Sequence, residues 1–270
     1  MVKYPYMTIL PAVQAELTTA TNRLLATVAS LSDACLAAPS LLPGWTRGHV
    51  LAHIAQNADS HLNLLTWART GVRTPQYASL AARSAAIEAA AAHSVARHLA
   101  EIEDGAARLA AAVRDMPQHA WSALVEGMRP PPHPAWYLLV RRLREVGFHH
   151  VDLNAGYTPA DSQASFVRRE LHDCLASWPG NHRTVGRIEL VEPGETEVVH
   201  VLGDGPTVRG TPRDMLAWLT GRSRGEGVSL VPMGRLFTSG HAGAGLPDPP
   251  PWLTMPAPAD LPTTPPKDYP

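Results

Sequence analysis

The sequence predicts an α+β protein in which an N-terminal bundle of four long helices precedes a smaller α+β domain. Three observations carry this prediction. Up to about Gly156 the chain is rich in Ala, Leu and His, and its apolar residues recur at helical spacing. Beyond Thr158, short β-like runs alternate with helical stretches and are separated by Pro-Gly and Gly-Asp-Gly turns. Residues 247–270 contain 10 of the 26 prolines, too many for a regular element.

These changes in composition place the domain boundaries. The chain has 270 residues, which suits two compact units at roughly 150 residues each. We expect a helical domain over residues 1–158, with a linker near residues 157–161, and an α+β domain over residues 159–253. Residues 254–270 are expected to form an extended, poorly packed tail.

Turn and cap signals set the limits of the predicted helices in the first domain. After the Pro43-Gly44 turn, Thr46 is a suitable N-cap for the second helix and Gly71 a suitable stop. The third helical stretch is long for a globular protein, so a break near His93-Ser94 is allowed. The loop GMRPPPHP cannot be helical because proline lacks the amide donor. The expected helices cover residues 11–30, 47–69, 79–116 and 135–154.

The second domain is expected to open with a helix over residues 163–178. Three short strands are expected to follow, in the runs RIELVE, EVVHVL and PTVRG. Thr211 then caps a helix in TPRDMLAWLTGR, with Pro212 at its first position. The segment GDGPTVRG is interpreted as a turn between strands and not as a phosphate-binding loop.

Composition and missing motifs exclude several classes of protein. The 23 Lys and Arg residues balance 24 Asp and Glu residues, which argues against a nucleic-acid binder. No window reaches about 18 consecutive apolar residues, so no membrane span is expected, and no signal peptide is recognised. Cys35 and Cys174 form no CxxC pair, which favours free thiols in a reducing cytoplasm. Because Walker A, HExxH and Gly-x-Ser-x-Gly motifs are missing, nucleotide-binding and hydrolase functions have little support.

The richest cluster of reactive side chains lies in the fourth predicted helix, in RRLREVGFHHVDLNAGY. Glu145 and His149 are four residues apart and share a helix face, where a carboxylate and an imidazole together suit a divalent metal such as zinc. Asp152 lies close enough to orient His149 from behind. The simpler interpretation is an ordinary Glu/His pair on a solvated face.

A third ligand is available on the second predicted helix, where His49 and His53 are also four residues apart. His53 lies near an apolar stripe, where a histidine is more often a hydrogen-bonded core residue than a ligand. One of these histidines, with Glu145 and His149, would complete the three-ligand arrangement of a catalytic zinc. Spacing alone does not decide which histidine contributes.

Arg222 and Arg224, in LTGRSRGEGV, follow the last predicted helix. They suit the negative C-terminal end of that helix, which is the simpler interpretation. They also suit bidentate binding of a substrate carboxylate.

Several strings along the chain resemble the mycothiol-dependent maleylpyruvate isomerase family. They are LLPGWTRGHVLAHIAQNA, NLLTWARTGVRTPQY, REVGFHHVDLNAGY, LTGRSRGEGV and GLPDPPPWL, and they span nearly the whole folded chain. The resemblance implies a DinB-like four-helix bundle with a bound zinc, followed by a smaller α+β domain. It also implies that the metal ligands are His53, Glu145 and His149, and that Arg222 is functionally important. A departure is His150, which stands beside a ligand and would compete with it if the helix rotated.

The same resemblance implies an enzyme that uses mycothiol and zinc, or another divalent metal, on a small-molecule substrate. The cation lowers the pKa of the mycothiol thiol, and the thiolate adds to the conjugated double bond of maleylpyruvate. Rotation about the resulting single bond and expulsion of the thiolate give fumarylpyruvate. Arg222 would hold a substrate carboxylate and stabilise the developing enolate. The residues that contact mycothiol and the oligomeric state stay unassigned.

Two other functions share the same ligand set. A mycothiol S-transferase would consume the thiol in a stable adduct with an electrophile or an intermediate of specialised metabolism. A non-catalytic metal-binding regulatory module would keep the ligands but need neither an open coordination position nor a substrate arginine. Product analysis separates the first alternative from the isomerase, and a mycothiol-dependent rise in melting temperature separates the second from both enzymes.

Overall fold

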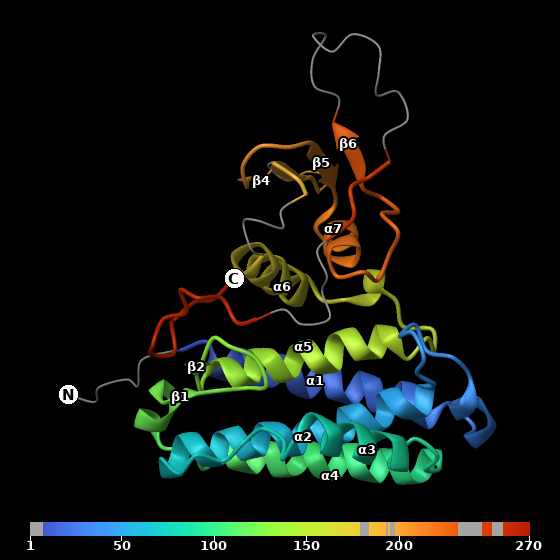
Figure 1. The fold of residues 1–270 in the computed structure, drawn as a ribbon, viewed down its shortest axis with the longest axis vertical. Coiled ribbons are helices and arrows are strands. Elements are labelled where there is room, and N and C mark those ends of the chain that lie inside the picture. The colour runs from blue at the N-terminus through green and yellow to red at the C-terminus, as the bar shows by residue number, and fades with distance from the viewer. Residues whose placement is uncertain (1–7, 179–183, 193, 195–197, 232–244, 250–255) are drawn as a thin grey trace. The chain divides into compact units, whose positions relative to one another are not determined.

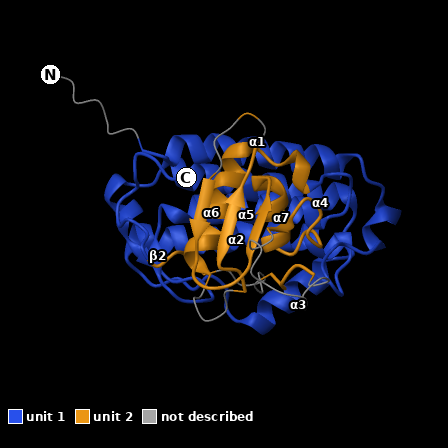
Figure 2. Ribbon diagram, turned by 90° about the horizontal axis from the view of Figure 1, so that it is seen from above, with its two compact units in different colours: residues 1–158, 260–269 blue, residues 159–259, 270 orange. Residues whose placement is uncertain are grey.

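The computed structural model describes residues 8–178, 184–192, 194, 198–231, 245–249 and 256–270. The chain divides into two compact units, Met1–Thr158 with Asp260–Tyr269 and Pro159–Ala259 with Pro270 (Figure 2). The first unit is helical, and the second combines helices with a mixed four-stranded sheet, which confirms the predicted fold class. In the described part of the chain, no helix combines the length and the apolar character that crossing a membrane would require.

Four long helices build the first unit (Figure 1): α1 (Leu10–Ala29), α2 (Arg47–Thr70), α4 (Val95–Arg114) and α5 (Tyr137–Asp152). Helices α1 and α2 each pack against both α4 and α5, so the apolar face of every helix is covered by two neighbours. The shorter α3 (Leu80–Ala90) lies against α2. Fully buried aliphatic side chains fill the interior, among them Leu24, Leu51, Ile54, Leu64, Ile102, Leu138, Leu139 and Leu143.

The predicted limits of the second helix are confirmed. The Thr46 hydroxyl accepts a hydrogen bond from the His49 amide at 3.4 Å, and Nδ1 of His49 accepts one from the Thr46 amide at 3.2 Å. This reciprocal cap satisfies two amides that helix geometry leaves without partners. At the other end Gly71 has a φ of 72°, which glycine adopts without strain, and its amide donates to the Trp67 carbonyl.

The long third stretch is two helices, with the break at the predicted position. The hydroxyl of Ser94 accepts a hydrogen bond from the Arg97 amide at 3.3 Å and starts α4. The turn before it packs closely on the start of α2, since a Cβ at Gly48 would collide with the Ala91 carbonyl oxygen. Glycine at position 48 therefore allows this turn to approach α2.

The fourth helix begins slightly later than predicted. Two short strands precede it, β1 (Leu124–Val125) and β2 (His133–Pro134), which pair in antiparallel fashion. The amides of Ala135 and Trp136 donate to the carbonyls of Ala123 and Trp121, at 2.9 and 3.0 Å. Because these bonds run to the preceding segment, the helix starts after Trp136.

The expectation of a poorly packed tail is wrong for the segment that belongs to the helical unit. Tyr269 is buried, and its ring lies edge-on to Trp136 and Tyr137 with centroids 5.2 and 6.2 Å apart. The indole Nε1 of Trp136 donates to the Pro262 carbonyl at 2.8 Å. An extended proline-rich segment can pack in this way because its carbonyls accept hydrogen bonds and a terminal aromatic ring supplies apolar area.

The second unit contains the α+β elements. Its helices are α6 (Ala164–Ser177) and α7 (Pro212–Leu219), which pack on each other. Its strands are β3 (Arg187–Leu190), β4 (Val198–Val201), β5 (Thr207–Gly210) and β6 (Ser229–Val231). The sheet order is β4-β3-β5-β6; β3 is antiparallel to β4 and parallel to β5, and β6 is antiparallel to β5.

The predicted helices and the three predicted strands of this unit are confirmed, whereas β6 was not expected. Thr211 caps α7 by accepting a hydrogen bond from the Asp214 amide at 3.2 Å. β6 has only three residues and follows a glycine-rich turn, so it lacks the alternating pattern that reveals a strand. Its pairing with β5 forms the second edge of the sheet.

Candidate metal centre

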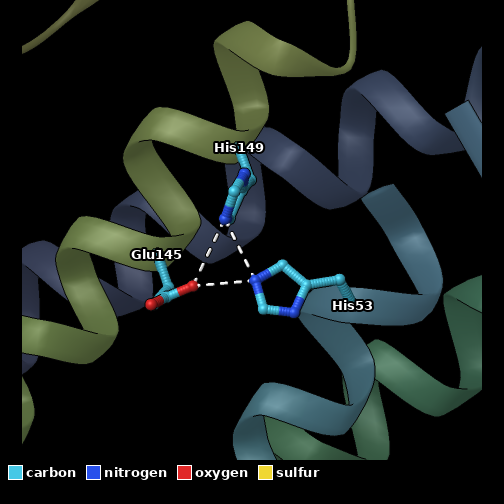
Figure 3. A group of neighbouring side chains, drawn as sticks. All are labelled: His53, Glu145 and His149. Carbon is cyan, nitrogen blue, oxygen red and sulfur yellow. Dashed lines mark hydrogen bonds and ion pairs between the residues drawn. The ribbon is translucent and has the colours of Figure 1, made fainter. Parts of the chain in front are cut away.

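Side chains from two helices of the bundle point toward one another inside the first unit (Figure 3). His53 lies in the second turn of α2, and Glu145 and His149 lie one turn apart on α5. Because α2 packs against α5, the three side chains meet although 92 and 96 residues separate His53 from the other two. Nε2 of His53 lies 2.9 Å from Oε2 of Glu145 and 3.0 Å from Nε2 of His149, which is itself 3.3 Å from Oε2.

This donor set fits a divalent cation. Zinc–ligand bonds of about 2.0–2.2 Å in a tetrahedral site place the donor atoms roughly 3.3–3.6 Å apart, a few tenths of an ångström beyond the observed separations. Three atoms that all touch one another cannot alternate as donors and acceptors, and an ionised Glu145 only accepts. Every placement of protons on His53 and His149 therefore leaves one close contact between two donors or two acceptors. A cation between the three atoms satisfies all of them at once.

The protonation states of His53 and Glu145 also suit metal binding. Burial, followed by the charge of the neighbouring His149, lowers the pKa of His53 to about 4. Burial opposes ionisation of Glu145, but hydrogen bonds from His149 and His53 outweigh it and hold the pKa of that carboxyl well below its usual range. A neutral imidazole and an ionised carboxylate, which metal ligation requires, are thus both present at neutral pH.

Asp152 orients His149 from behind, as the sequence spacing predicted. Its Oδ2 lies 2.9 Å from Nδ1 of His149, and the side chain is buried. Burial lowers the pKa of His149, but the hydrogen bonds to Asp152 and Glu145 overcome this effect and raise it. By accepting the Nδ1 proton, the carboxylate keeps the Nε2 atom as the one that faces the cluster.

Arg83 on α3 is a residue of this site that the sequence did not reveal. Its Nη2 lies 3.1 Å from Nδ1 of His53, and the guanidinium lies 5.7 Å above the ring of Tyr77. Its buried Nε has no hydrogen-bond partner among the residues that the structure describes. A lone arginine in the alanine-rich run AARSAAIEAA carries no spacing signal, so only the packing of α3 on α2 brings it here.

The contact with Arg83 fixes the tautomer of His53. A guanidinium only donates, so Nδ1 of His53 accepts and the ring proton lies on Nε2, which faces the cluster. Ligation of a metal through Nε2 requires the opposite tautomer, with the proton on Nδ1. Arg83 must therefore release His53 and bind another acceptor when a metal is held by these three residues.

Two other histidines that the sequence offered as alternative ligands, His49 and His150, bind residues outside the cluster. His49 belongs to the cap of α2, and its Nε2 lies 3.0 Å from Oε2 of Glu88. Nε2 of His150 lies 2.8 Å from the hydroxyl of Thr27, and its ring stacks on Tyr157 with centroids 3.8 Å apart. Neither ring is directed at the cluster, and the geometry favours His53 as the ligand from α2.

The predicted arginines belong to the second unit, whereas the histidine–glutamate cluster belongs to the first. Arg222 is half-buried just after α7, and its Nη1 donates to the Thr220 carbonyl at 2.7 Å, a contact with the helix end. The exposed Arg224 donates its amide to Oε2 of Glu226 at 2.7 Å. A substrate-binding role for Arg222 stays a prediction.

Comparisons with known proteins relate both units to one family. The family model described as "Mycothiol maleylpyruvate isomerase N-terminal domain" matches residues 17–154, and "MDMPI C-terminal domain" matches residues 161–244. Similar solved structures include the crystal structure of the mycothiol-dependent maleylpyruvate isomerase and that of a point mutant of it. Each is 29% identical in sequence, has a TM-score of 0.77 and aligns over 90% of this chain and 97% of the other. No curated protein sequence matches the chain.

The N-terminal family model alone spans more than half of the chain, and the second model continues through the α+β unit. The solved structures agree with this over nearly their whole length. The chain therefore belongs to the mycothiol maleylpyruvate isomerase family.

Proposed function

We propose that this chain is a metal- and mycothiol-dependent cis–trans isomerase that converts maleylpyruvate to fumarylpyruvate. The observation that carries the proposal is the cluster of His53, Glu145 and His149, whose crowded donor atoms suit a cation, in a chain of this family. Zinc suits two imidazoles and a carboxylate best, and the same ligands accept other divalent ions.

The cation and the residues around it would each have a separate role in the reaction. The bound cation would lower the pKa of the mycothiol thiol, whose reversible addition to the conjugated double bond of maleylpyruvate allows rotation about the resulting single bond. Asp152 keeps the Nδ1 proton of His149 in place, so that Nε2 stays available as a ligand. The ionised Glu145 offsets part of the added positive charge inside the bundle.

Arg83 is the residue that we assign to substrate binding in the helical unit. Once His53 ligates through Nε2, its Nδ1 carries a proton and no longer accepts from Arg83. The guanidinium then needs another acceptor, and a carboxylate of the substrate offers two oxygens in the matching geometry. Arg83 would thus hold the charged end of the substrate beside the metal.

Arg222 is proposed to hold a substrate carboxylate and to stabilise the negative charge that develops on the enolate. Arg222→Ala should depress turnover sharply while the zinc content stays that of the wild type. Unchanged turnover in that variant would remove Arg222 from the proposed site.

Product analysis tests the function. The full chain is loaded with zinc and incubated with mycothiol and maleylpyruvate, and the products are identified by NMR spectroscopy and mass spectrometry. We expect fumarylpyruvate with the mycothiol conserved, and a much slower conversion by His149→Ala. A stable mycothiol adduct would contradict the isomerase and indicate an S-transferase. No conversion, together with no change of melting temperature on adding mycothiol, would indicate a non-catalytic module.

A further inference from the structure

A second group of ligand-type side chains lies where α3 gives way to α4. His93 lies in the turn between the two helices, and His98 and Glu101 lie in the first two turns of α4. One nitrogen of each histidine and one carboxylate oxygen of Glu101 all lie within 4.8 Å of one another. Nδ1 of His93 is 3.2 Å from Oε1 of Glu101, and the two imidazole rings are 5.7 Å apart between centroids.

His98 is the unusual member of this group. Its side chain is 0% exposed, and in the described part of the chain neither ring nitrogen has a hydrogen-bond partner. The Ala91 carbonyl approaches the ring without the geometry of a hydrogen bond. Buried polar atoms are rarely left in this state, because they lose their water without gaining another partner. One of the two nitrogens therefore needs a partner, which an ordered water or a bound cation would supply.

The charge state of the group suits a cation. Burial lowers the pKa of His98, so its ring is neutral at pH 7 and offers a lone pair. Glu101 is ionised, because hydrogen bonds from Arg97 and His93 lower its pKa more than burial raises it. Arg97 binds Oε1 of Glu101 through its Nε at 2.6 Å, whereas Oε2 lies 3.3 Å from Nδ1 of His93, inside the group.

We propose that His93, His98 and Glu101 form a second divalent-cation site, distinct from the cluster on α2 and α5, which takes a zinc-like ion. Two imidazoles and one carboxylate favour zinc over magnesium or calcium, which prefer oxygen ligands. His93 and Glu101 reach the surface and give the ion a path inward, whereas His98 holds its buried side. The ion joins the turn to the first two turns of α4 and thereby stiffens the end of α3.

This position matters to the rest of the unit because α3 has few other attachments. The buried Ile87 and Ala90 of α3 pack with Ala52 of α2 and the half-buried Trp45, in a small cluster. The same helix carries Arg83, which reaches His53. A cation at the turn would therefore hold in place the helix that brings the guanidinium to the first site.

Metal stoichiometry of the full chain tests the proposal. The protein is stripped with a chelator, titrated with zinc against a chromophoric competitor, and weighed by native mass spectrometry. We expect two zinc ions per wild-type chain and one each for His93→Gln, Glu101→Gln and His149→Gln. The double variant His93→Gln/His149→Gln should bind none. The exposed His119, which belongs to neither group, gives the matched control, and His119→Gln should keep both ions.

The half-exposed positions 93 and 101 are chosen because their replacement should leave the fold intact, which circular dichroism would verify. Cobalt substitution gives a second readout, since each occupied site contributes its own visible absorption band. A single zinc per wild-type chain that His149→Gln removes and His93→Gln retains would overturn the proposal. So would a second zinc that His93→Gln and Glu101→Gln both retain, or one that binds only at millimolar concentration. None of these outcomes depends on isomerase activity.

Discussion

The helical unit contains two groups of the same composition, two histidines and a glutamate, and it assembles them in different ways. His53 faces Glu145 and His149 across two long helices, with 92 and 96 residues of chain between them. The group at the α3–α4 turn spans only residues 93–101. The first group is held in position by the packing of a bundle, which gives the rigid geometry that catalysis needs. The second depends on one turn and the helix that follows it, which suits a structural role.

The largest difference between the two groups is expected in turnover, when one histidine of each group is replaced. His149→Ala leaves the first group with two ligands, and we expect isomerase turnover to fall about 1000-fold, because a bound metal supplies several kcal/mol of catalysis. His93→Gln in the second group should leave turnover at saturating maleylpyruvate within about twofold, because Arg83, the residue that α3 brings to the first site, is assigned an effect on KM. Steady-state rates of the two variants, measured at equal zinc, provide the check. Equal losses in both would show that the two groups are not independent.

Acid should lower the free energy of unfolding of the helical unit, mainly through two buried histidines of its interior. Burial, followed by the charges of Arg142 and Arg141 respectively, lowers the pKa of His61 and of His133 to about 3, from 6.5 in the unfolded chain. The unfolded state then binds more protons, so the stability that these groups contribute is complete above pH 6.5 and is lost as the pH falls toward 3. At pH 4 the loss should be about 3 kcal/mol for each histidine.

Urea unfolding of the metal-free chain at pH 7, 5 and 4 measures this loss. His61→Gln and His133→Gln should each flatten the dependence of unfolding free energy on pH below 6.5. His119→Gln, at an exposed position, should leave the dependence as it is in the wild type. An unchanged slope in both buried variants would mean that other groups cause the acid loss.

Asp152 distinguishes the first group from the second, which lacks a carboxylate hydrogen-bonded behind its buried histidine in the described part of the chain. Asp152→Asn removes the negative charge that holds the Nδ1 proton of His149. We expect zinc affinity at the first site to fall about 10–100-fold. Competition with a chromophoric chelator measures it, and Asp115→Asn, at an exposed position, is the control. An affinity unchanged in Asp152→Asn would show that the backbone alone orients His149.

Arg83 links the two groups, since it lies on the helix between them and contacts His53. Arg83→Met should raise KM for maleylpyruvate about tenfold, through loss of a charged hydrogen bond to the substrate. It should not weaken zinc binding, because the guanidinium favours the His53 tautomer that does not ligate. Arg83→Lys should restore part of the affinity for substrate, and Arg69→Met, at an exposed position, should change neither quantity. A weaker zinc affinity with an unchanged KM would assign Arg83 to positioning His53 instead.

The smallest effect is expected at the cysteines. Cys35 and Cys174 form no disulfide bond, and both are half-buried, one in each unit. If the reactive thiol belongs to mycothiol, replacing both cysteines by alanine should keep turnover within about twofold. A large loss, with zinc content unchanged, would place a protein thiol in the reaction.

Local signals in the sequence were enough to define most of the helical elements. The apolar period of 3.6 residues and the caps at Thr46, Gly71 and Ser94 depend only on neighbours within one or two turns. For the same reason the spacing of Glu145, His149 and Asp152 placed all three on one side of α5. The family resemblance, and not the spacing, selected His53 over His49 on the facing helix.

Tertiary structure decided every feature that joins distant segments. The parallel pairing of β3 with β5 bypasses the strand that lies between them in the sequence, and Tyr269 packs on Trp136, about half the chain length away. Arg83 reaches His53 only because α3 lies on α2. A periodic pattern shows which face of a helix or strand is apolar, but it does not show which other helix or strand packs against that face. The sequence by itself therefore determined most of the helices and three of the strands, together with the two cluster residues on α5, and the packing of the bundle brought the third, His53, to them.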